Sequence, residues 1–329
     1  VRMDLRIACK EAAHGDGLPQ AGDVKQDLEI RLLEALLSAF EDPDWYFCRW
    51  WAKGVWLGSA KRKLPRTPAV FPRKTRWRKY EEIDQLHAGW QENYGSLDEH
   101  AALVQAQFEQ EEREDLMCTM TVREALERYG DLLNVAATGV IAKKGRTDEV
   151  RVIFDGSHGI DLNHGIKVRD QIQFPGAADG KEVLAECADE GGPHFSLHVD
   201  FSKAHRRVAI LMEEWGRQAC QVGGRAAATA QRVLKARATV ARKVPESTGR
   251  RAVLTPNAKI RAQDLPEDVL NETLWLNKVG TFGVASAGYW WGRAGACIAR
   301  LSHYMLGFDY AVWLLLYADD EWLVGRTAR

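Results

Sequence analysis

The spacing of apolar and polar residues changes character near residue 131. Upstream of it, residues 26–40 carry apolar side chains at helical spacing, and the acidic residues 97–116 are typical of a helix exposed to solvent. Thr121 and Glu124 form the pattern of a capping box, which predicts the start of a short helix. The first 130 residues are therefore predicted to be mostly helical.

Downstream, runs typical of β-strands alternate with helices. Residues 134–142 and 149–155 are β-rich and flank the segment KKGRTD, so they predict a β-hairpin with glycine in its turn. The further predicted elements are a short helix over 180–190, a strand over 194–200, short strands over 207–222, a long helix over 284–306, and strands over 311–317 and 321–325. The last two strands are joined by Ala318, Asp319 and Asp320.

Two strongly basic stretches stand out in a nearly neutral chain. The formal net charge is -1 over 329 residues, which excludes a uniformly basic nucleic-acid-binding protein but leaves room for local patches. Residues 61–79 hold nine Lys and Arg and no acid, while residues 225–264 are rich in Ala and Arg and have the low complexity of an insert. Either stretch could hold a nucleic-acid backbone, with Trp77 stacking on a base. A solvated or disordered run of charges is the alternative.

The rest of the composition fits a globular protein with a core, because 46% of residues are hydrophobic and 28% are charged. The six cysteines include no C-x-x-C pair, which predicts reduced thiols rather than a zinc site or a disulfide framework. The sequence has no recognisable signal peptide, and its longest apolar run, residues 310–317, is shorter than the roughly 20 residues of a membrane span. We therefore expect an intracellular protein that is not secreted and contacts no membrane. Both ends look truncated, so we also expect a piece of a longer protein.

Three aspartates follow strand-like runs, and their placement suggests a chemistry. Asp319 and Asp320 lie between two apolar strands, and Asp200 ends another. Phosphoryl transfer from a nucleoside triphosphate uses two divalent ions held about 4 Å apart, and Mg²⁺ prefers oxygen ligands. A tight hairpin with two Asp, beside a strand that ends in a third, would gather such ligands. For the hairpin alone, a plain turn is the alternative, since Asp is common in turns for backbone reasons.

Four motifs follow one another along residues 135–325. In the first motif, a Lys143-Lys144 turn precedes Arg151 and Asp155 on a strand. The second, LHVDFSKAHRR, contains Asp200, Phe201 and His205, and the third, TFGVASAGYWWGR, contains Phe282, Gly283 and Ser286. The fourth is the hairpin Tyr317-Ala318-Asp319-Asp320. In this order the motifs resemble those of the reverse transcriptases of retroelements, a family of right-hand polymerases. The surrounding runs RVIFDGSHGIDLN and KVRDQIQFP also resemble retroelement copies in dinoflagellate genomes.

The resemblance implies an α+β fold. Residues 131–329 would form the fingers and the palm of the polymerase, with β-hairpin fingers and an antiparallel palm sheet flanked by helices. Residues 225–264 would be a basic insert between the palm motifs. Residues 1–130 match no part of the family, and the thumb, which follows the palm in the family, would be absent.

The resemblance also implies a role for each motif residue. Asp200 and Asp319 would bind two Mg²⁺ or Mn²⁺ ions, with Asp320 as a weaker ligand. The incoming nucleotide would lie against Lys144, Arg151, Asp155, Phe201 and His205, where the cations hold the triphosphate. The template-primer would lie against Phe282, Gly283, Ser286 and Tyr317. A solvated hairpin is the alternative for the cations, a plain helix start for Gly283 and Ser286, and a core aromatic for Tyr317.

His205 stands where the family usually has Tyr or Phe beneath the nucleotide sugar, which leaves the choice between deoxy- and ribonucleotides open. We expect a template-directed DNA polymerase that takes an RNA or DNA template-primer and dNTPs. An inactive relic that keeps the fold and at most binds nucleic acid is the alternative. An RNA polymerase on the same palm fits less well, because Gly usually precedes the paired Asp there and Ala318 stands here. The sequence leaves the oligomeric state open.

Overall fold

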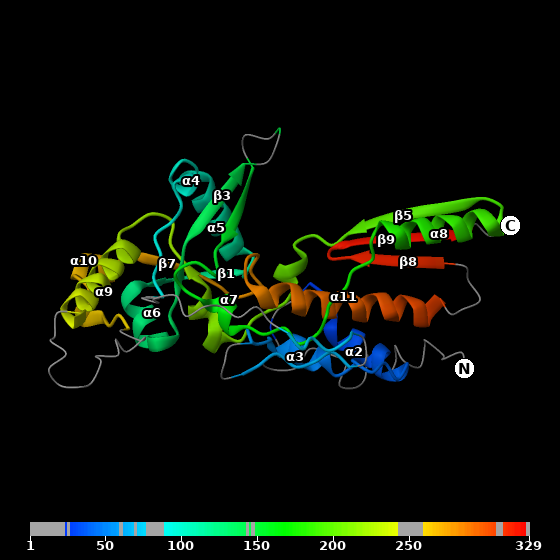
Figure 1. The fold of residues 1–329 in the computed structure, drawn as a ribbon, viewed down its shortest axis with the longest axis horizontal. Coiled ribbons are helices and arrows are strands. Elements are labelled where there is room, and N and C mark those ends of the chain that lie inside the picture. The colour runs from blue at the N-terminus through cyan, green and yellow to red at the C-terminus, as the bar shows by residue number, and fades with distance from the viewer. Residues whose placement is uncertain are drawn as a thin grey trace.

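The structure, a computed structural model, describes residues 24, 27–58, 62–68, 71–76, 89–142, 145, 149–242, 259–306 and 312–326. The described part of the chain is a mixture of helices and mainly antiparallel strands (Figure 1). Its upstream helices are α2 (Ile30–Ala39), α3 (Phe47–Lys53), α4 (Gly95–Asp98), α5 (Ala101–Arg113) and α6 (Val122–Tyr129). The predicted capping box is confirmed, because the side chains of Thr121 and Glu124 each accept a hydrogen bond from the other residue's backbone N–H.

Two sheets lie in the half of the molecule that holds α4, α5 and α6 (Figure 1). The first has the order β1-β7-β6-β2, formed by β1 (Met117–Thr121), β7 (Thr273–Asn277), β6 (Ala219–Cys220) and β2 (Val135–Ala136), and only its β2–β6 pair is parallel. The second is the hairpin of β3 (Thr138–Ala142) and β4 (Val150–Phe154), with Thr138 opposite Phe154. The hairpin predicted from the two β-rich runs is therefore confirmed.

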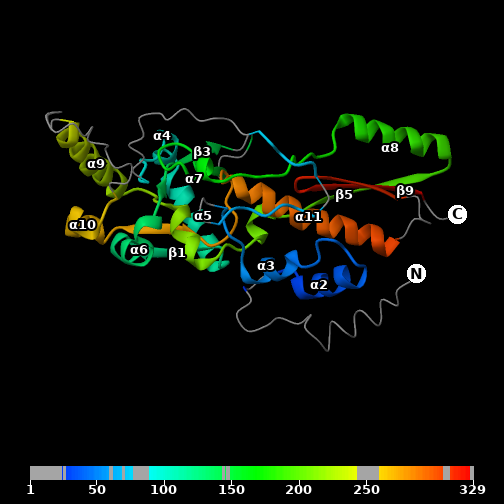
Figure 2. The same ribbon diagram turned by 60° about the horizontal axis from the view of Figure 1, so that its bottom comes forward.

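The third sheet has the order β5-β9-β8, formed by β5 (His194–Asp200), β9 (Asp320–Arg326) and β8 (Val312–Tyr317). The helix α8 (Ala177–Glu190) covers one face, where Val183 and Cys187 pack with Val324. The long helix α11 (Ala285–Leu306) lies on the other side, where Gly295 approaches Leu316 (Figures 1 and 2). Side chains alternate between the faces of a strand, so α8 and α11 pack on opposite faces of this sheet. The edge strand β5 stays largely uncovered, since its Phe195 and Leu197 are 42% and 51% exposed.

The main hydrophobic core joins the start and the end of the described chain. Trp290 of α11 stacks on Phe47 of α3 at 5.9 Å between ring centroids and meets Trp56 edge to face at 5.1 Å. Trp290 is fully buried and donates its indole N–H to the carbonyl of Trp56 at 2.7 Å. The predicted boundary at residue 130 thus runs through one continuous core, which contains residues from both of its sides.

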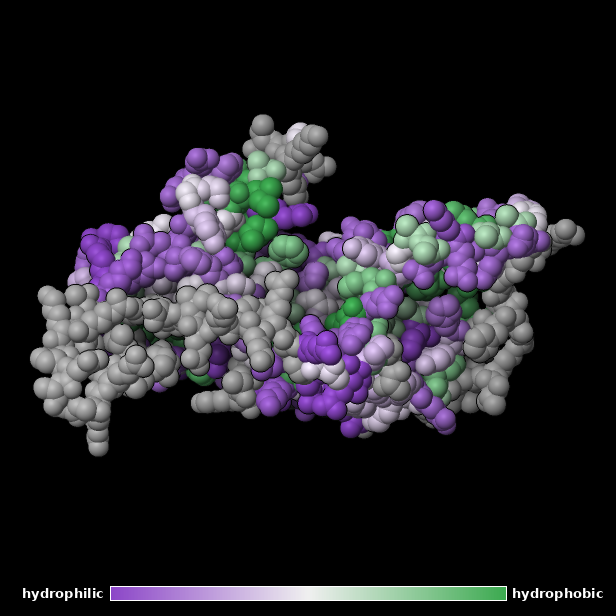
Figure 3. Space-filling view, viewed as in Figure 1, coloured by the Kyte–Doolittle hydropathy of each residue, from purple (hydrophilic) through white to green (hydrophobic). Residues whose placement is uncertain are grey.

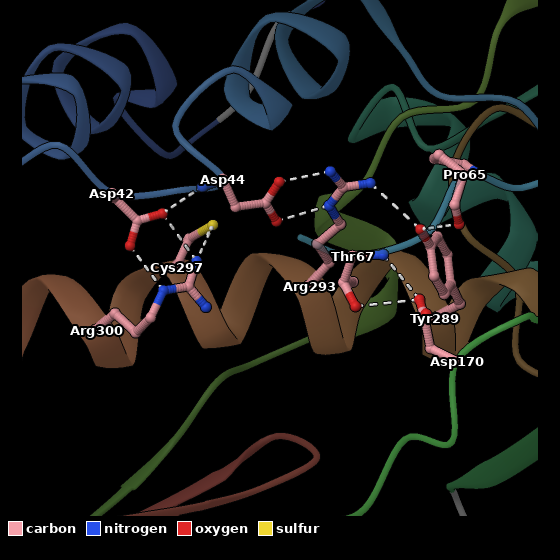
Figure 4. Close-up of polar contacts among 9 residues, drawn as sticks. All are labelled: Asp42, Asp44, Pro65, Thr67, Asp170, Tyr289, Arg293, Cys297 and Arg300. Carbon is pink, nitrogen blue, oxygen red and sulfur yellow. Dashed lines mark hydrogen bonds and ion pairs between the residues drawn. The ribbon is translucent and has the colours of Figure 1, made fainter. Parts of the chain in front are cut away.

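Ion pairs reinforce this joint between the α2–α3 connection and α11 (Figure 4). Arg293 is buried and donates to Asp44, with Nε 2.7 Å from Oδ2. Two turns further along α11, Arg300 binds Asp42 through Nε and Nη2 at 2.7 and 3.0 Å. Because Asp42 and Asp44 are both buried, the two arginines provide the partners that their carboxylates need.

Two predicted stretches differ from their expectation. Over 207–222 only β6 is a strand, and residues 212–218 form the 3₁₀ helix η3 (Met212–Gln218). The Glu214 carboxylate accepts the Leu57 N–H and the Trp215 indole donates to the Ile210 carbonyl at 2.7 Å, so side chains replace strand pairing here. The prediction of short strands is confirmed at β6 and is wrong for residues 212–218.

The expected low-complexity insert at 225–264 contains a packed helix, α9 (Ala226–Arg242). Ala226, Ala230 and Leu234 recur at helical spacing, and all three are buried in a second core with α6 and α10 (Glu267–Leu270). Few apolar residues suffice, because alanine lets helices approach closely. Residues 243–258 lie outside the described part.

The remaining short elements are α7 (Leu162–Gly165) and the 3₁₀ helices η1 (Gly130–Leu132), η2 (Ala204–Arg207) and η5 (Ala262–Asp264). The five described cysteines form no disulfide with one another, and four of them are buried. None of the described helices combines the length and the apolar character that a membrane span requires.

Candidate active site

The three predicted carboxylates meet at one end of the sheet β5-β9-β8. Asp200, the last residue of β5, lies directly opposite Asp320, the first residue of β9. The backbone N–H of Phe201 donates to the carbonyl of Asp319 at 3.0 Å, which holds the end of β5 against the turn. Residues opposite each other in an antiparallel pair have Cβ atoms about 4.5–5.5 Å apart. The backbone therefore brings Asp200, Asp319 and Asp320 to adjoining positions.

The turn that carries Asp319 has two residues, because Tyr317 pairs with Asp320 across the hairpin. Ala318 takes a φ of 56° and Asp319 does not take a positive φ, which is the pattern of φ angles in a type II′ turn. Such a turn favours Gly at its first central residue, and Ala in the left-handed region costs about 1 kcal/mol or more. Contacts from outside the turn must offset this cost.

Trp291 of α11 supplies such a contact. Its buried indole donates from Nε1 to the carbonyl of Ala318 at 2.8 Å, and its ring meets Phe201 edge to face at 5.4 Å. One side chain thus holds both segments that carry the carboxylates. Sequence reasoning missed this residue. The sequence could have indicated that a buried Trp in this helix needs an acceptor for its indole N–H. It could not have indicated that the acceptor is the Ala318 carbonyl, because the fold alone brings the two together.

The negative charge of the three carboxylates is not balanced by ion pairs with neighbouring side chains of the described residues. Asp200 and Asp320 are exposed and opposed, and like charges directly opposite each other destabilise a sheet. Within the described chain no Lys or Arg forms an ion pair with them or with Asp319. Oxygen ligands without a counter-charge suit a divalent cation. No three His, Cys, Asp or Glu side chains of the described residues already form a closed ligand cage, so an ion would have to draw these carboxylates together.

His205 lies beside this cluster on η2. Burial lowers the pKa of its imidazole, and the nearby Asp319 opposes this by favouring the charged form. The ring meets the exposed Phe282 edge to face at 6.3 Å between centroids. The structure therefore brings three predicted site residues, His205, Phe282 and Asp319, into one neighbourhood, with His205 half-buried between the other two.

Gly283 serves the packing of the protein itself. It has a φ of 104°, and a Cβ at this position would lie 1.8 Å from the carbonyl oxygen of Phe154. Asn163 donates to the Gly283 carbonyl at 2.8 Å and accepts from the Ala285 N–H at 2.7 Å, so it caps the start of α11. Sequence reasoning missed Asn163. Ser286 is fully buried, with no hydrogen-bond partner for its hydroxyl.

The β3–β4 hairpin carries the predicted triphosphate ligands. Arg151 is exposed on β4, opposite Ile141, and Lys144 lies outside the described residues. Figure 3 shows hydrophobic side chains over this hairpin and a dip in the surface between it and the sheet β5-β9-β8. The structure thus places Arg151 on a separate element from the carboxylates.

Asp155 closes the loop after β4. Its Oδ1 accepts the N–H groups of Ser157 and His158 at 2.9 and 3.0 Å, and Tyr94 donates its hydroxyl to Oδ2 at 2.5 Å. Burial would raise the pKa of this carboxyl, but these hydrogen bonds lower it below its usual value. Both oxygens are therefore already used within the protein.

Tyr317 is 58% exposed, so the alternative of a core aromatic does not hold. Its ring contacts Phe174, which precedes α8, at 5.5 Å between centroids. Phe174, Tyr317 and Phe282 are all exposed aromatic residues around the carboxylate cluster. Exposed aromatic rings beside charged groups offer stacking surfaces for bases.

Comparison with known proteins adds no family to this picture. No protein-family model matches the chain, and no curated protein matches its sequence.

Proposed function

We propose that this chain is a template-directed DNA polymerase of the reverse-transcriptase type, which adds dNTPs to a primer 3′-hydroxyl on an RNA or DNA template. The observation that carries the proposal is the register of Asp200 opposite Asp320, with Asp319 in the intervening turn. The proposal further rests on the order of the four sequence motifs, which includes all three aspartates.

In this proposal Asp200 and Asp319 hold two Mg²⁺ or Mn²⁺ ions, and Asp320 assists. When bound, the ions would lower the pKa of the primer hydroxyl and neutralise charge on the leaving pyrophosphate. The unpaired charge of the three carboxylates supports this role. Arg151, together with Lys144, would hold the triphosphate, while Phe201 and His205 would lie beside the sugar.

The template-primer would lie across the exposed rings of Phe282 and Tyr317, which are 54% and 58% exposed. Gly283 and Ser286 would act indirectly, because both are engaged in packing around the start of α11. Asp155 would likewise support the β3–β4 hairpin rather than contact the nucleotide.

A relic that keeps the fold without catalysis is the second candidate. Two observations favour it: the carboxylates form no closed ligand cage, and a His replaces the family's aromatic residue at position 205. Such a chain would retain at most nucleic-acid binding.

Primer extension on poly(rA)/oligo(dT) with Mg²⁺ or Mn²⁺ tests the proposal. We expect extension by the wild type and a loss of about 100-fold or more for Asp319→Asn, because removing a metal ligand withdraws several kcal/mol of transition-state stabilisation. Asp189→Asn is the matched control: Asp189 is exposed on α8, outside the cluster, and its removal should leave the rate unchanged. Equal rates in the wild type and Asp319→Asn would refute the site. Absence of extension with both ions would favour the relic.

A further inference from the structure

Three extended segments lie side by side next to α11, and we call residues 62–68, 71–76 and 167–171 the basic ribbon. Arg73 and Asp170 form an antiparallel bridge. The Lys74 N–H donates to the Arg169 carbonyl at 2.7 Å, and the Gln171 N–H donates to the Pro72 carbonyl at 2.9 Å. The basic stretch found in the sequence is therefore paired with a second basic segment, about 95 residues further along the chain.

Asp170 ties the third segment of the ribbon to the first. Its buried carboxylate accepts from the Thr67 N–H at 2.8 Å and from the Thr67 hydroxyl at 3.1 Å (Figure 4). It also accepts from Arg66 Nε at 3.0 Å. Arg66 also donates to the Phe71 carbonyl at 3.0 Å. The only acid of the ribbon is thus turned inward and neutralised.

The other charges of the ribbon have one sign. Its cations are Arg62, Lys63, Arg66, Arg73, Lys74, Arg76, Lys167 and Arg169. Five of these eight are exposed: Arg62, Lys63, Arg73, Arg76 and Lys167. Since the whole chain has a net charge of -1, this is a concentrated local excess of positive charge. Such a surface binds a polyanion through its phosphates.

The ribbon has a fixed position relative to the carboxylate cluster. The Tyr289 hydroxyl of α11 donates to the Pro65 carbonyl at 2.8 Å, and Trp56 donates from Nε1 to the Lys63 carbonyl at 3.0 Å. Three residues beyond Gln171, Phe174 contacts Tyr317 at the start of the Asp319 turn. A strand bound along the ribbon would therefore reach the exposed rings of Phe174 and Tyr317 next.

We propose that the basic ribbon binds the phosphate backbone of a single-stranded nucleic acid and leads that strand toward the Asp319–Asp320 turn. The destination of the strand rests on the proposed polymerase function, whereas the binding itself requires no catalysis. A single strand fits better than a duplex, because a row of cations that ends in exposed aromatic rings offers both phosphate contacts and base stacking.

The test measures binding of a fluorescein-labelled dT20 oligonucleotide to the whole chain by fluorescence anisotropy, in EDTA, across a series of salt concentrations. The test variant is Arg73→Gln with Arg76→Gln. The matched control is Arg232→Gln with Lys235→Gln, which removes two exposed cations from α9. Unchanged thermal unfolding of each variant verifies that it is folded.

Each phosphate contact to a single strand contributes a slope of about -0.7 in log affinity against log salt. We therefore expect the ribbon variant to bind roughly 25-fold more weakly at about 0.1 M salt and to lose about 1.4 from the magnitude of the slope. The α9 variant should bind like the wild type, and a dT20–dA20 duplex should bind more weakly than dT20.

Three results would overturn the proposal: no binding of dT20 by the wild type, no effect of the ribbon variant, or an equal effect of the two variants. Tighter binding of the duplex would refute the assignment to a single strand. Ribbon-dependent binding without any primer extension would leave the ribbon standing while the polymerase proposal fails. Asp319→Asn should bind dT20 as the wild type does, which separates the two proposals.

Discussion

Gly283 shows at the scale of one residue how tightly the candidate site is joined to its surroundings. The backbone at this position takes a conformation that side chains disfavour, and the carbonyl oxygen of Phe154 fills the space that a Cβ would need. The sequence motif alone suggests that this glycine contacts a template. Its packing against Phe154 accounts for a glycine at this position without any ligand.

Gly283→Ala should therefore destabilise the protein by about 2 kcal/mol or more, from the positive φ and the clash with backbone together. Gly292→Ala is the control, because Gly292 lies within α11 with open space around its Cβ position. There, Ala should stabilise by up to about 1 kcal/mol through helix propensity. Urea unfolding measures both changes. Equal stabilities of the two variants would contradict the packing seen at Gly283.

Residue-level prediction from the sequence succeeded where neighbours along the chain decide the outcome. The turn after β8 and the end of β5 follow from local patterns. That Asp200 would meet Asp319 and Asp320 was expected from the order of the motifs, because β5 and β9 are far apart in the sequence. The partners of Trp291 and Asn163 could not, since their acceptors are brought close only by tertiary packing.

At the scale of elements, α11 links the core to the hairpin turn. Trp290 and Trp291 are adjacent and buried, and each donates its indole N–H to a carbonyl, of Trp56 and of Ala318 respectively. One side chain thus faces the core and the other faces the turn that carries Asp319. We regard Trp291 as a positioning residue for that turn.

Trp291→Phe and Trp290→Phe form a matched pair. Each should lose about 1–3 kcal/mol of stability, because a buried carbonyl loses its donor and some packing is lost. If the proposed function holds, only Trp291→Phe should lower kcat for primer extension, by about tenfold, the cost of roughly 1.4 kcal/mol at the barrier. The KM for dNTP should change little. A similar kcat for both variants would show that Trp291 acts through stability alone.

Elements with a strong local pattern were predictable. Sequence periodicity anticipated α2, α5 and α11, the β3–β4 hairpin, and the strands β5, β8 and β9. The 3₁₀ helix at 212–218 could not be predicted in this way. Its Glu214 accepts the N–H of the distant Leu57, and its Trp215 donates to the nearby Ile210 carbonyl, so side-chain bonds replace a strand partner. The helix α9 was hidden by composition, since its buried face is mostly alanine.

At the scale of the whole molecule, buried ion pairs fasten the α2–α3 connection to α11. Asp44→Ala would leave Arg293 buried without its carboxylate partner, so we expect a loss of about 3–5 kcal/mol. Glu267→Ala is the control: its pair with Arg123 is exposed, and such pairs contribute at most about 1 kcal/mol. Thermal unfolding compares them. An equally small loss of stability in both variants would show that the Asp44–Arg293 pair does not hold the α2–α3 connection to α11.

The joint between Trp56 and Trp290 also bears on how the protein is made. The two residues are 234 positions apart in the chain, and ribosomes add about 5–20 residues per second. The apolar surface of α2 and α3 therefore waits roughly 12 to 47 s for its partner helix to be synthesised. During that interval Phe47 and Trp51 have no completed core to enter, so their apolar side chains stay open to non-native contacts while the chain is being made.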